Sequence, residues 1–254
     1  MSRCGLPTSV SASHQRFTAS SPGGWPVESS TEQNALPPDL ETIEVALFPI
    51  PDIVAFPGMV VPLHVFEPRY RQLVHDCVNE DRLVAVSHTL KTIHQPNRVQ
   101  QSTEEALRSN QATYKPQQVF SAGRCEILET MPDGRLLAAI TMQQRLTLLN
   151  EVRSLPYRIV SCAVLKDHDA SGWNEDTSAL QRIVHNRLIE LVEASDQNVA
   201  EELRKPEWLA CDPADYSFRI FQVLRFQADV MQYLLETDSV AERLEAIAAL
   251  LEAN

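Results

Sequence analysis

Between residues 47 and 70 the sequence reads LFPIPDIVAFPGMVVPLHVFEPRY, an apolar stretch that is long enough to cross a bilayer but is interrupted repeatedly by proline. A membrane helix is excluded here, because proline lacks an amide donor and breaks a helix interior. Proline is also kept out of central strands, so the stretch favours sheet edges, bends and a strongly curved sheet. The five prolines are Pro49, Pro51, Pro57, Pro62 and Pro68.

Short strands and one helix are predicted around these prolines. Residues 44–50, 52–58 and 59–66 have the β-branched and aromatic composition of strands. Pro57 and Gly58 suit the two central positions of a type II turn, because glycine accepts the positive φ needed at the second. Pro68 then fits the first position of a helix. The apolar face of that helix would comprise Tyr70, Leu73, Val74, Cys77 and Val78, which recur at helical spacing.

Further strands are predicted at residues 82–90, within 119–149 and at 157–165. Pro132, Asp133 and Gly134 indicate a turn inside the middle stretch, and Gly123 indicates a bulge or a close backbone contact. Residues 91–116 are polar and are interpreted as a long loop that can hold a short helix over Thr103–Ser109. Residues 41–166 are therefore predicted to form one compact, mostly β unit.

After Trp173 the patterns become helical, so residues 173–254 are predicted to form a bundle of four or five amphipathic helices. Asp212 is expected to cap a helix that has Pro213 at its first position. The last helix has a broad Ala, Leu and Ile surface, part of which could be shared with a partner. The predicted apolar stripes are Leu180, Ile183, Val184, Leu188, Leu191 and Val192, and then Val240, Leu244, Ile247, Ala248 and Leu251.

Residues 1–40 are rich in Ser, Thr, Pro and Gly and lack periodicity, so they are predicted to be a disordered leader. A Ser-rich, acid-poor leader is also typical of an organelle transit peptide, which leaves an organelle as the alternative to a cytoplasmic location. The five cysteines are an odd number with no CxxC pair, which favours a reduced intracellular chain without structural zinc.

Charge is distributed unevenly along the chain. The formal net charge is −12, and residues 167–254 account for most of it with 18 acidic and 7 basic residues, a charge of −11. Affinity for nucleic acids depends mainly on Lys and Arg that displace counterions from phosphates. Binding of DNA or RNA through the C-terminal part is therefore not expected.

The motifs that support common catalytic chemistry are absent from the sequence. There is no GxxxxGK[ST], GxGxxG or GxSxG, and hence no P-loop, dinucleotide loop or nucleophile elbow of the usual kind. His64 and Glu67 form an HxxE pair, but one histidine at a strand-to-helix junction cannot reproduce a two-histidine metal site, so a structural turn is the preferred interpretation. We expect no cofactor and no metal.

The other residues whose side chains could take part in catalysis or metal binding are interpreted as structural. His185, Glu190 and Glu193 are interpreted as part of a solvated helix surface. Cys77 and Cys162 have apolar neighbours in the sequence and are expected to be inert core residues. An enzyme with an unrecognised acid-base pocket, of which His64 and Glu67 would be the candidates, remains an alternative.

The residues LFPIPDIVAFPGMVVPLHVFEPRYRQLVHDCV resemble the start of the Lon protease N-terminal domain, in the stand-alone form without ATPase or protease domains. Residues 123–127, the PDGR turn, LPYRIVSCAVL and SVAERLEAIAALL follow in the order of that family, so the similarity spans about 43–253. Two departures are a longer polar loop at 91–116 and the loss, around Ala139 to Arg145, of a common glycine and a phenylalanine-flanked arginine.

The resemblance implies an α+β fold, in which a PUA-like, strongly twisted β-barrel precedes a helical bundle. It also implies recognition of unfolded or partner polypeptides, with an ATP-dependent protease as one possible partner, and no catalysis, since no catalytic Ser or Lys can be carried over. Binding would bury apolar side chains and use edge-strand hydrogen bonds. A nucleic-acid-binding PUA-like protein is the alternative, and a homo-oligomer stays open. The candidate contacts are Phe56, Met59, Val61 and Phe66.

Overall fold

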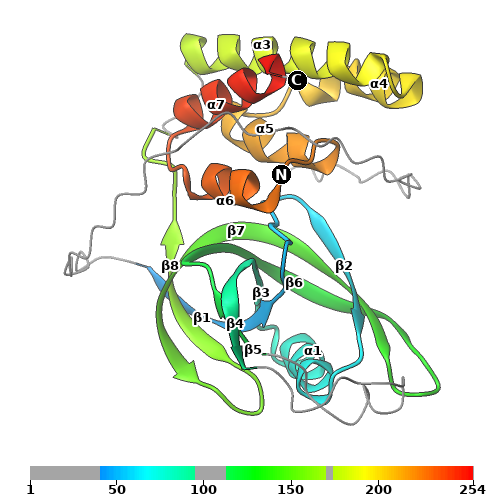
Figure 1. Cartoon of the computed structure of the whole chain (residues 1–254), viewed down its shortest axis with the longest axis vertical. Coiled ribbons are helices and arrows are strands. Elements are labelled where there is room, and N and C mark those ends of the chain that lie inside the picture. Colours follow the sequence, from blue (N-terminus) through cyan, green and yellow to red (C-terminus); the bar gives the residue numbers. More distant parts are fainter. Residues whose placement is uncertain (1–40, 95–112, 170–173, 254) are drawn as a thin grey trace.

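The computed structural model describes residues 41–94, 113–169 and 174–253. A layer of helices lies over one end of a ring of strands, and a single helix, α1, lies at the opposite end of the ring (Figure 1). The elements of the first part are β1 (Thr42–Pro49), β2 (Val60–Val65), α1 (Pro68–Glu80), β3 (Val84–Ser87), β4 (Thr89–His94), β5 (Thr113–Pro116), β6 (Val119–Thr130), β7 (Leu136–Arg153) and β8 (Ile159–Leu165). The α+β class is confirmed.

Six strands form one sheet in the order β2-β7-β6-β3-β1-β8, and an additional pairing of β7 with β8 closes the sheet into a ring. The long strand β7 makes this possible, because its first half pairs with β2 and its second half with β8 while β6 runs along both. β1 and β3 are parallel, with Ala46 opposite Val84, whereas the other pairs are antiparallel. A strongly curved sheet is what the prolines predicted.

Gly123 allows β6 and β7 to approach closely at a bulge. The register shifts between Ala122 and Gly123, and a Cβ placed on Gly123 would lie 1.9 Å from the backbone oxygen of Thr141. A side chain of any kind is therefore excluded at this position. The predicted bulge and close backbone contact are both confirmed.

Two predictions for the first part were wrong in detail. Residues 52–58 form turns and loop rather than a strand, since three consecutive residues, Val54, Ala55 and Phe56, are all buried instead of alternating between two faces. Gly58 has φ of 83°, as the predicted turn requires. The ends of 91–116 are not loop but the strands β4 and β5, which form a separate antiparallel sheet. The helix predicted at Thr103–Ser109 and the leader 1–40 lie outside the described residues.

Helix α1 covers one face of the sheet. Pro68 occupies its first turn, and Tyr70, Leu73, Val74 and Cys77 are buried as predicted, whereas Val78 is 39% exposed. Alternation along the strands separates two apolar clusters. Ala46 packs in the cluster that contains α1, while its neighbours Val45 and Leu47 pack in the cluster on the opposite face.

The second part is an all-helical layer, and its five α-helices agree with the prediction. Asp212 caps α5 by accepting a hydrogen bond from Ala214 N, with Pro213 at the first position. The stripe predicted for the last helix is buried in full. The elements are α3 (Glu175–Glu193), α4 (Gln197–Leu203), the 3₁₀ turn η1 (Pro206–Trp208), α5 (Pro213–Arg219), the 3₁₀ turn η2 (Ile220–Gln222), α6 (Ala228–Glu236) and α7 (Val240–Glu252).

His185 corrects another prediction, because it lies in the core of the helical layer and not on its surface. The side chain is 3% exposed, and Nδ1 lies 3.2 Å from the Tyr216 hydroxyl. Ile183, which was expected in the buried stripe, is instead 43% exposed. The buried face of α3 therefore includes polar side chains that find hydrogen-bond partners. Hydrophobic periodicity cannot detect such positions, because it counts only apolar residues.

The loop between β1 and β2 joins the ring to the helical layer. Phe56 of this loop is fully buried among the helices, where its ring stacks on Phe221 with centroids 4.0 Å apart. Gln222 Nε2 donates to Gly58 O at 3.0 Å beside this stack. The β1–β2 loop therefore contributes to both cores, because Val54 and Phe56 pack in the helical layer while Ala55 packs in the cluster of the sheet that contains α1.

Buried charges form a second connection between ring and helices. Asp167, in the segment after β8, accepts hydrogen bonds from Arg145 Nη2 at 2.5 Å and from Arg243 Nη1 and Nη2 at 2.8 Å. Arg145 also donates to Leu235 O and Thr237 O at the C-terminal end of α6, where carbonyl groups favour a cation. All three charged groups are thus paired although they are almost completely buried.

Candidate functional site

The two residues of the HxxE pair have different environments. His64 is exposed on β2, whereas Glu67 is buried and pairs with Arg69 Nη2 at 3.0 Å. Within the described residues, no group of three or more His, Cys, Asp or Glu side chains is arranged to hold a metal ion. No helix in the same ranges is both long and apolar enough to span a bilayer.

Cys77 and Cys162 are core residues, as expected. Cys77 and Cys162 are buried, and desolvation raises the pKa of each thiol to about 12. Burial also raises the pKa of Cys125 to about 11. These thiols stay protonated near neutral pH and are therefore poor nucleophiles.

The four predicted contact residues have different environments. Phe56 is fully buried and Val61 is 6% exposed, so neither presents a surface to an incoming chain in this structure. Met59 and Phe66 are only partly buried. Met59 packs against the helical cluster. The space between ring and helices is thus largely filled by the protein's own side chains.

The free edge of β2 is poorly suited to adding a strand. Met142 N donates to Met59 O at 2.8 Å, and the register continues with Val61 opposite Ile140. In an antiparallel ladder the alternate residues, Val60, Pro62 and His64, then direct their backbone groups away from β7. Pro62 has no N–H to offer there, which is a common protection of sheet edges. The expected edge-strand hydrogen bonds are therefore not favoured at β2.

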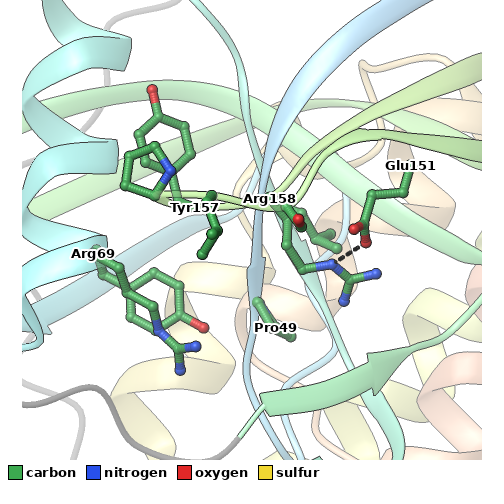
Figure 2. Close-up of a pocket in the computed structure, with 10 residues that line it drawn as sticks. Pro49, Arg69, Glu151, Tyr157 and Arg158 are labelled. Atoms are coloured by element: carbon green, nitrogen blue, oxygen red, sulfur yellow. Dashed lines mark hydrogen bonds and ion pairs between the residues drawn. The ribbon is translucent and has the colours of Figure 1, made fainter.

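The β7–β8 hairpin and α1 lie at the end of the ring opposite the helical layer (Figure 1). Residues of both elements line a concave site. Its volume is about 340 Å³. Arg69 and Tyr157 lie on one side, and Arg158 with Glu151 on the other (Figure 2). The lining residues are Leu47, Pro49, Arg69, Tyr70, Glu151, Ser154, Leu155, Pro156, Tyr157 and Arg158. We call this site the hairpin pocket.

Aromatic residues build one wall of the hairpin pocket. The Tyr70 ring stacks on Phe48 with centroids 4.1 Å apart, and the Arg69 guanidinium lies 4.5 Å from the Tyr70 centroid. Burial raises the pKa of Tyr70 to about 12, so its hydroxyl is neutral. Tyr70 is 8% exposed, and its hydroxyl makes no hydrogen bond to any residue that the structure describes.

Tyr157 has its hydroxyl engaged within the protein. It donates to Asp76 Oδ2 of α1 at 2.8 Å, which ties the hairpin to the helix. The pKa of Tyr157 is raised to about 12, mainly by desolvation and to a smaller extent by this contact with Asp76. The Arg153 guanidinium lies 5.2 Å from the Tyr157 centroid. The hairpin is therefore held in a defined position beside α1.

Arg158 is oriented from two directions. Its Nε donates to Glu151 Oε2 at 2.6 Å, and its Nη1 donates to Tyr114 O of β5 at 3.1 Å. Among the described residues no partner engages Nη2, which leaves two N–H donors. Arginine in this setting is a preorganised donor for a carboxylate or a carbonyl group.

Exposed apolar side chains lie on the hairpin itself. Leu155 is 76% exposed and lines the pocket, and Val152 is 49% exposed on the same hairpin. Exposed apolar groups beside a concave site are typical of interaction surfaces. Sequence reasoning missed this pocket because its lining comes from three separate segments, residues 47–49, 69–70 and 151–158, of which the last is about 80 positions from the second. The apolar Leu155-Pro156 pair within a polar turn was the available signal.

Comparison with solved structures supports the fold. A Lon N-terminal domain protein from Xanthomonas campestris superposes with a TM-score of 0.55 at 19% identity, covering 82% of this chain and 98% of that one. The N-terminal domain of the Mycobacterium avium complex Lon protease gives 0.59 at 15% identity, covering 83% and 98%. At these identities the likeness extends to the fold alone.

Sequence comparison finds full-length proteases as relatives. Lon protease 1 of Herpetosiphon aurantiacus is 22% identical over 219 residues, which are 85% of this chain but 24% of that protein. The Lon protease of Trichlorobacter lovleyi is 24% identical over 208 residues, 81% of this chain and 23% of the relative. The chain thus spans about a quarter of the length of these relatives.

Residues 44–253 match the family described as the ATP-dependent protease La (LON) substrate-binding domain. The match begins within β1 and covers the rest of the ring, the β4–β5 sheet, α1 and the helical layer, which is the region in which the sequence resembled this family. This chain therefore belongs to the LON substrate-binding domain family.

Proposed function

We propose that this chain is a non-catalytic module that recognises polypeptides and presents them to a partner, with an ATP-dependent protease as the candidate partner. The observation that carries the proposal is the hairpin pocket, a concave site with exposed apolar side chains on a member of a substrate-binding family. The binding energy would come from burying such side chains, at about 25 cal/mol per Å² of apolar surface.

Met59 and Phe66 remain proposed secondary contacts, because both are only partly buried. Phe56 and Val61 would contribute indirectly, by fixing the loop and the strand that carry Met59. The hairpin pocket and Met59 lie toward opposite ends of the ring, so a client chain would have to run along the ring to contact both. The proposed primary contact is Leu155, since it is the more exposed of the two apolar hairpin side chains.

The test compares an unfolded polypeptide with its folded form. Reduced, carboxymethylated α-lactalbumin stays unfolded in solution, and fluorescence anisotropy of the labelled protein should report binding to this chain, whereas native α-lactalbumin should not bind. Leu155→Ser should weaken the capture, while Leu128→Ser, at a site 61% exposed and outside the pocket lining, should not. Equal binding of both client forms, or of neither, would contradict the proposal.

A second experiment addresses the partner. The tagged chain is mixed with the ATP-dependent proteases of its own cells, and degradation of the unfolded client is followed with and without it. Faster degradation that requires Leu155 supports presentation to a protease. A rate that is the same with the chain, without it and with Leu155→Ser contradicts that part of the proposal.

A further inference from the structure

The polar groups that the hairpin pocket leaves available are hydrogen-bond donors. Arg158 has two N–H groups on Nη2 without a partner among the described residues, and the hydroxyl of Tyr70, a residue that is 8% exposed, has none there either. Arg69, whose guanidinium is already paired with Glu67, adds a second positive charge to the lining. A ligand group that accepts several hydrogen bonds, and is preferably negative, matches this set.

The carboxylates of this region are already engaged by the protein. Glu67 pairs with Arg69, Asp76 accepts from Tyr157, and Glu151, the one carboxylate among the lining residues, accepts from Arg158. The opposite end of the molecule is the helical part, for which residues 167–254 have a formal charge of −11. The hairpin pocket therefore offers an acidic ligand cationic donors at the end of the molecule that lies away from most of the negative charge.

The remainder of the pocket is apolar. Leu47, Pro49, Leu155 and Pro156 line it together with the two tyrosine rings. A volume of about 340 Å³ is at the lower end of the range for ligand pockets and has room for one or two side chains rather than a folded domain. The ligand must accordingly combine an apolar side chain with an acceptor group close to it.

We propose that the hairpin pocket selects polypeptide segments in which an apolar side chain is adjacent to a carboxylate, with the carboxylate on Arg158 and Tyr70 and the apolar side chain against Leu155. This inference rests on the proposed function and adds the class of segment recognised. The carboxylate can belong to a Glu or Asp side chain or to a free C-terminus, since both present the same two oxygens.

Glu151 acts as an internal competitor in this arrangement. Its carboxylate is 2.6 Å from Arg158 Nε, and its side chain is 37% exposed, so it can swing away when a ligand carboxylate arrives. Removing its charge should therefore strengthen binding of acidic segments, whereas removing the charge of Arg158 should weaken it. If the pair were purely structural, removing either charge should change the affinity for acidic segments in the same direction.

The test uses fluorescein-labelled nine-residue peptides and anisotropy titration of the whole chain. A central Leu is followed by Glu, Gln or Lys in C-terminally amidated peptides, and a further peptide ends on Leu with a free carboxylate. We expect the Glu peptide to bind about fivefold more tightly than the Gln peptide and the Lys peptide to be weakest. The free-carboxylate peptide shows whether a C-terminus is also accepted.

The variants locate the selectivity. Arg158→Gln should remove the preference for Glu over Gln, Glu151→Gln should increase affinity for the Glu peptide, and Leu155→Ser should weaken every peptide about tenfold. Arg182→Gln is the matched control, since Arg182 is exposed on α3 far from the pocket. Circular dichroism checks that each variant is folded. If Arg158→Gln does not fold, the increase in affinity for the Glu peptide expected of Glu151→Gln still tests the proposal.

Two negative results have different meanings. Equal affinity for the Glu, Gln and Lys peptides, or an effect of Arg158→Gln no larger than that of Arg182→Gln, overturns the selectivity while capture of unfolded α-lactalbumin still stands. Failure of all peptides together with failure of that capture overturns the proposed function itself. Capture of α-lactalbumin without any peptide binding also overturns this inference, because a pocket of this size should bind short segments.

Discussion

His185 and Gly123 affect the structure around them in different ways. His185 does so as a buried titratable ring, and Gly123 does so because it has no side chain. His185 is enclosed by the helical core beside Tyr216. Gly123 lets the β7 backbone pass at a distance that no side chain permits. Both positions have effects on stability that can be measured separately from binding.

Burial lowers the pKa of His185, opposed in part by a hydrogen bond with the Leu203 backbone. The unfolded chain, with a histidine pKa near 6.5, therefore binds a proton at a higher pH than the folded protein does. Stability should fall as pH drops below about 6.5, and this component should be lost in His185→Gln but retained in the control His64→Gln, whose site is exposed. Urea denaturation between pH 7.5 and 5 measures it, and identical slopes in both variants would contradict the assignment.

Gly123→Ala should destabilise the protein by about 3 kcal/mol or more, because the new Cβ overlaps backbone atoms that cannot rotate away. Gly58→Ala is the comparison, since its Cβ would have space, with the nearest atom 4.0 Å away, but φ is 83°. It should cost only about 1–2 kcal/mol. Chemical denaturation of both variants checks the order, and a larger loss at Gly58 would refute the steric explanation.

At the scale of elements, two alternate aspartates of the segment after β8 fix the helical layer. Asp169 accepts hydrogen bonds from Ser239 Oγ, Val240 N and Ala241 N at the start of α7. Partial burial raises the pKa of Asp169, but these hydrogen bonds outweigh it and hold the pKa below its usual value. Asp167 binds Arg145 from β7 and Arg243 from α7. One short segment thus positions α7 against the ring.

Asp167→Asn should destabilise the protein by about 3–5 kcal/mol, because it leaves two buried guanidinium groups without their anion. Asp238→Asn is the matched control, since Asp238 is 57% exposed and lies 3.6 Å from an exposed histidine, His168. Its effect should be below about 1 kcal/mol. Thermal and urea unfolding measure both, and similar losses would argue that the buried network adds little.

At the scale of the whole molecule, ring and helical layer share a core through the β1–β2 loop. Phe56 comes from the β part of the chain, yet it stacks on Phe221 and packs near Phe218, with centroids 4.0 and 6.0 Å away. Gln232 Nε2 also donates to Val119 O at the start of β6. We therefore expect the two parts to unfold as one cooperative unit.

Phe56→Ala should cost about 3–5 kcal/mol and lower hydrogen-exchange protection in both β2 and α6, because it removes a side chain that both parts enclose. Val60→Ala, four residues away and 46% exposed, should leave protection unchanged. Exchange measured by mass spectrometry distinguishes the two. Loss of protection confined to the helices would mean that the parts unfold independently.

Much of the fold follows from local chemistry and could be predicted. Proline placement indicated a curved sheet, the 3.6-residue period located α1 and α7, and the residues at Asp212-Pro213 marked the start of α5. Family membership followed from the same stretch. Such features depend on residues that are neighbours in sequence, which is why the sequence alone determined them.

Other features depend on residues that only the tertiary structure brings together. The burial of Phe56 among helices, the burial of His185 beside Tyr216 and the convergence of Tyr70 with Arg158 each join positions dozens of residues apart. A sequence specifies each side chain, but it does not show which distant residues will bury that side chain or pair with it. The sequence by itself therefore determined the elements and the family, while burial and pairing across the closed ring decided the pocket and the contacts between its parts.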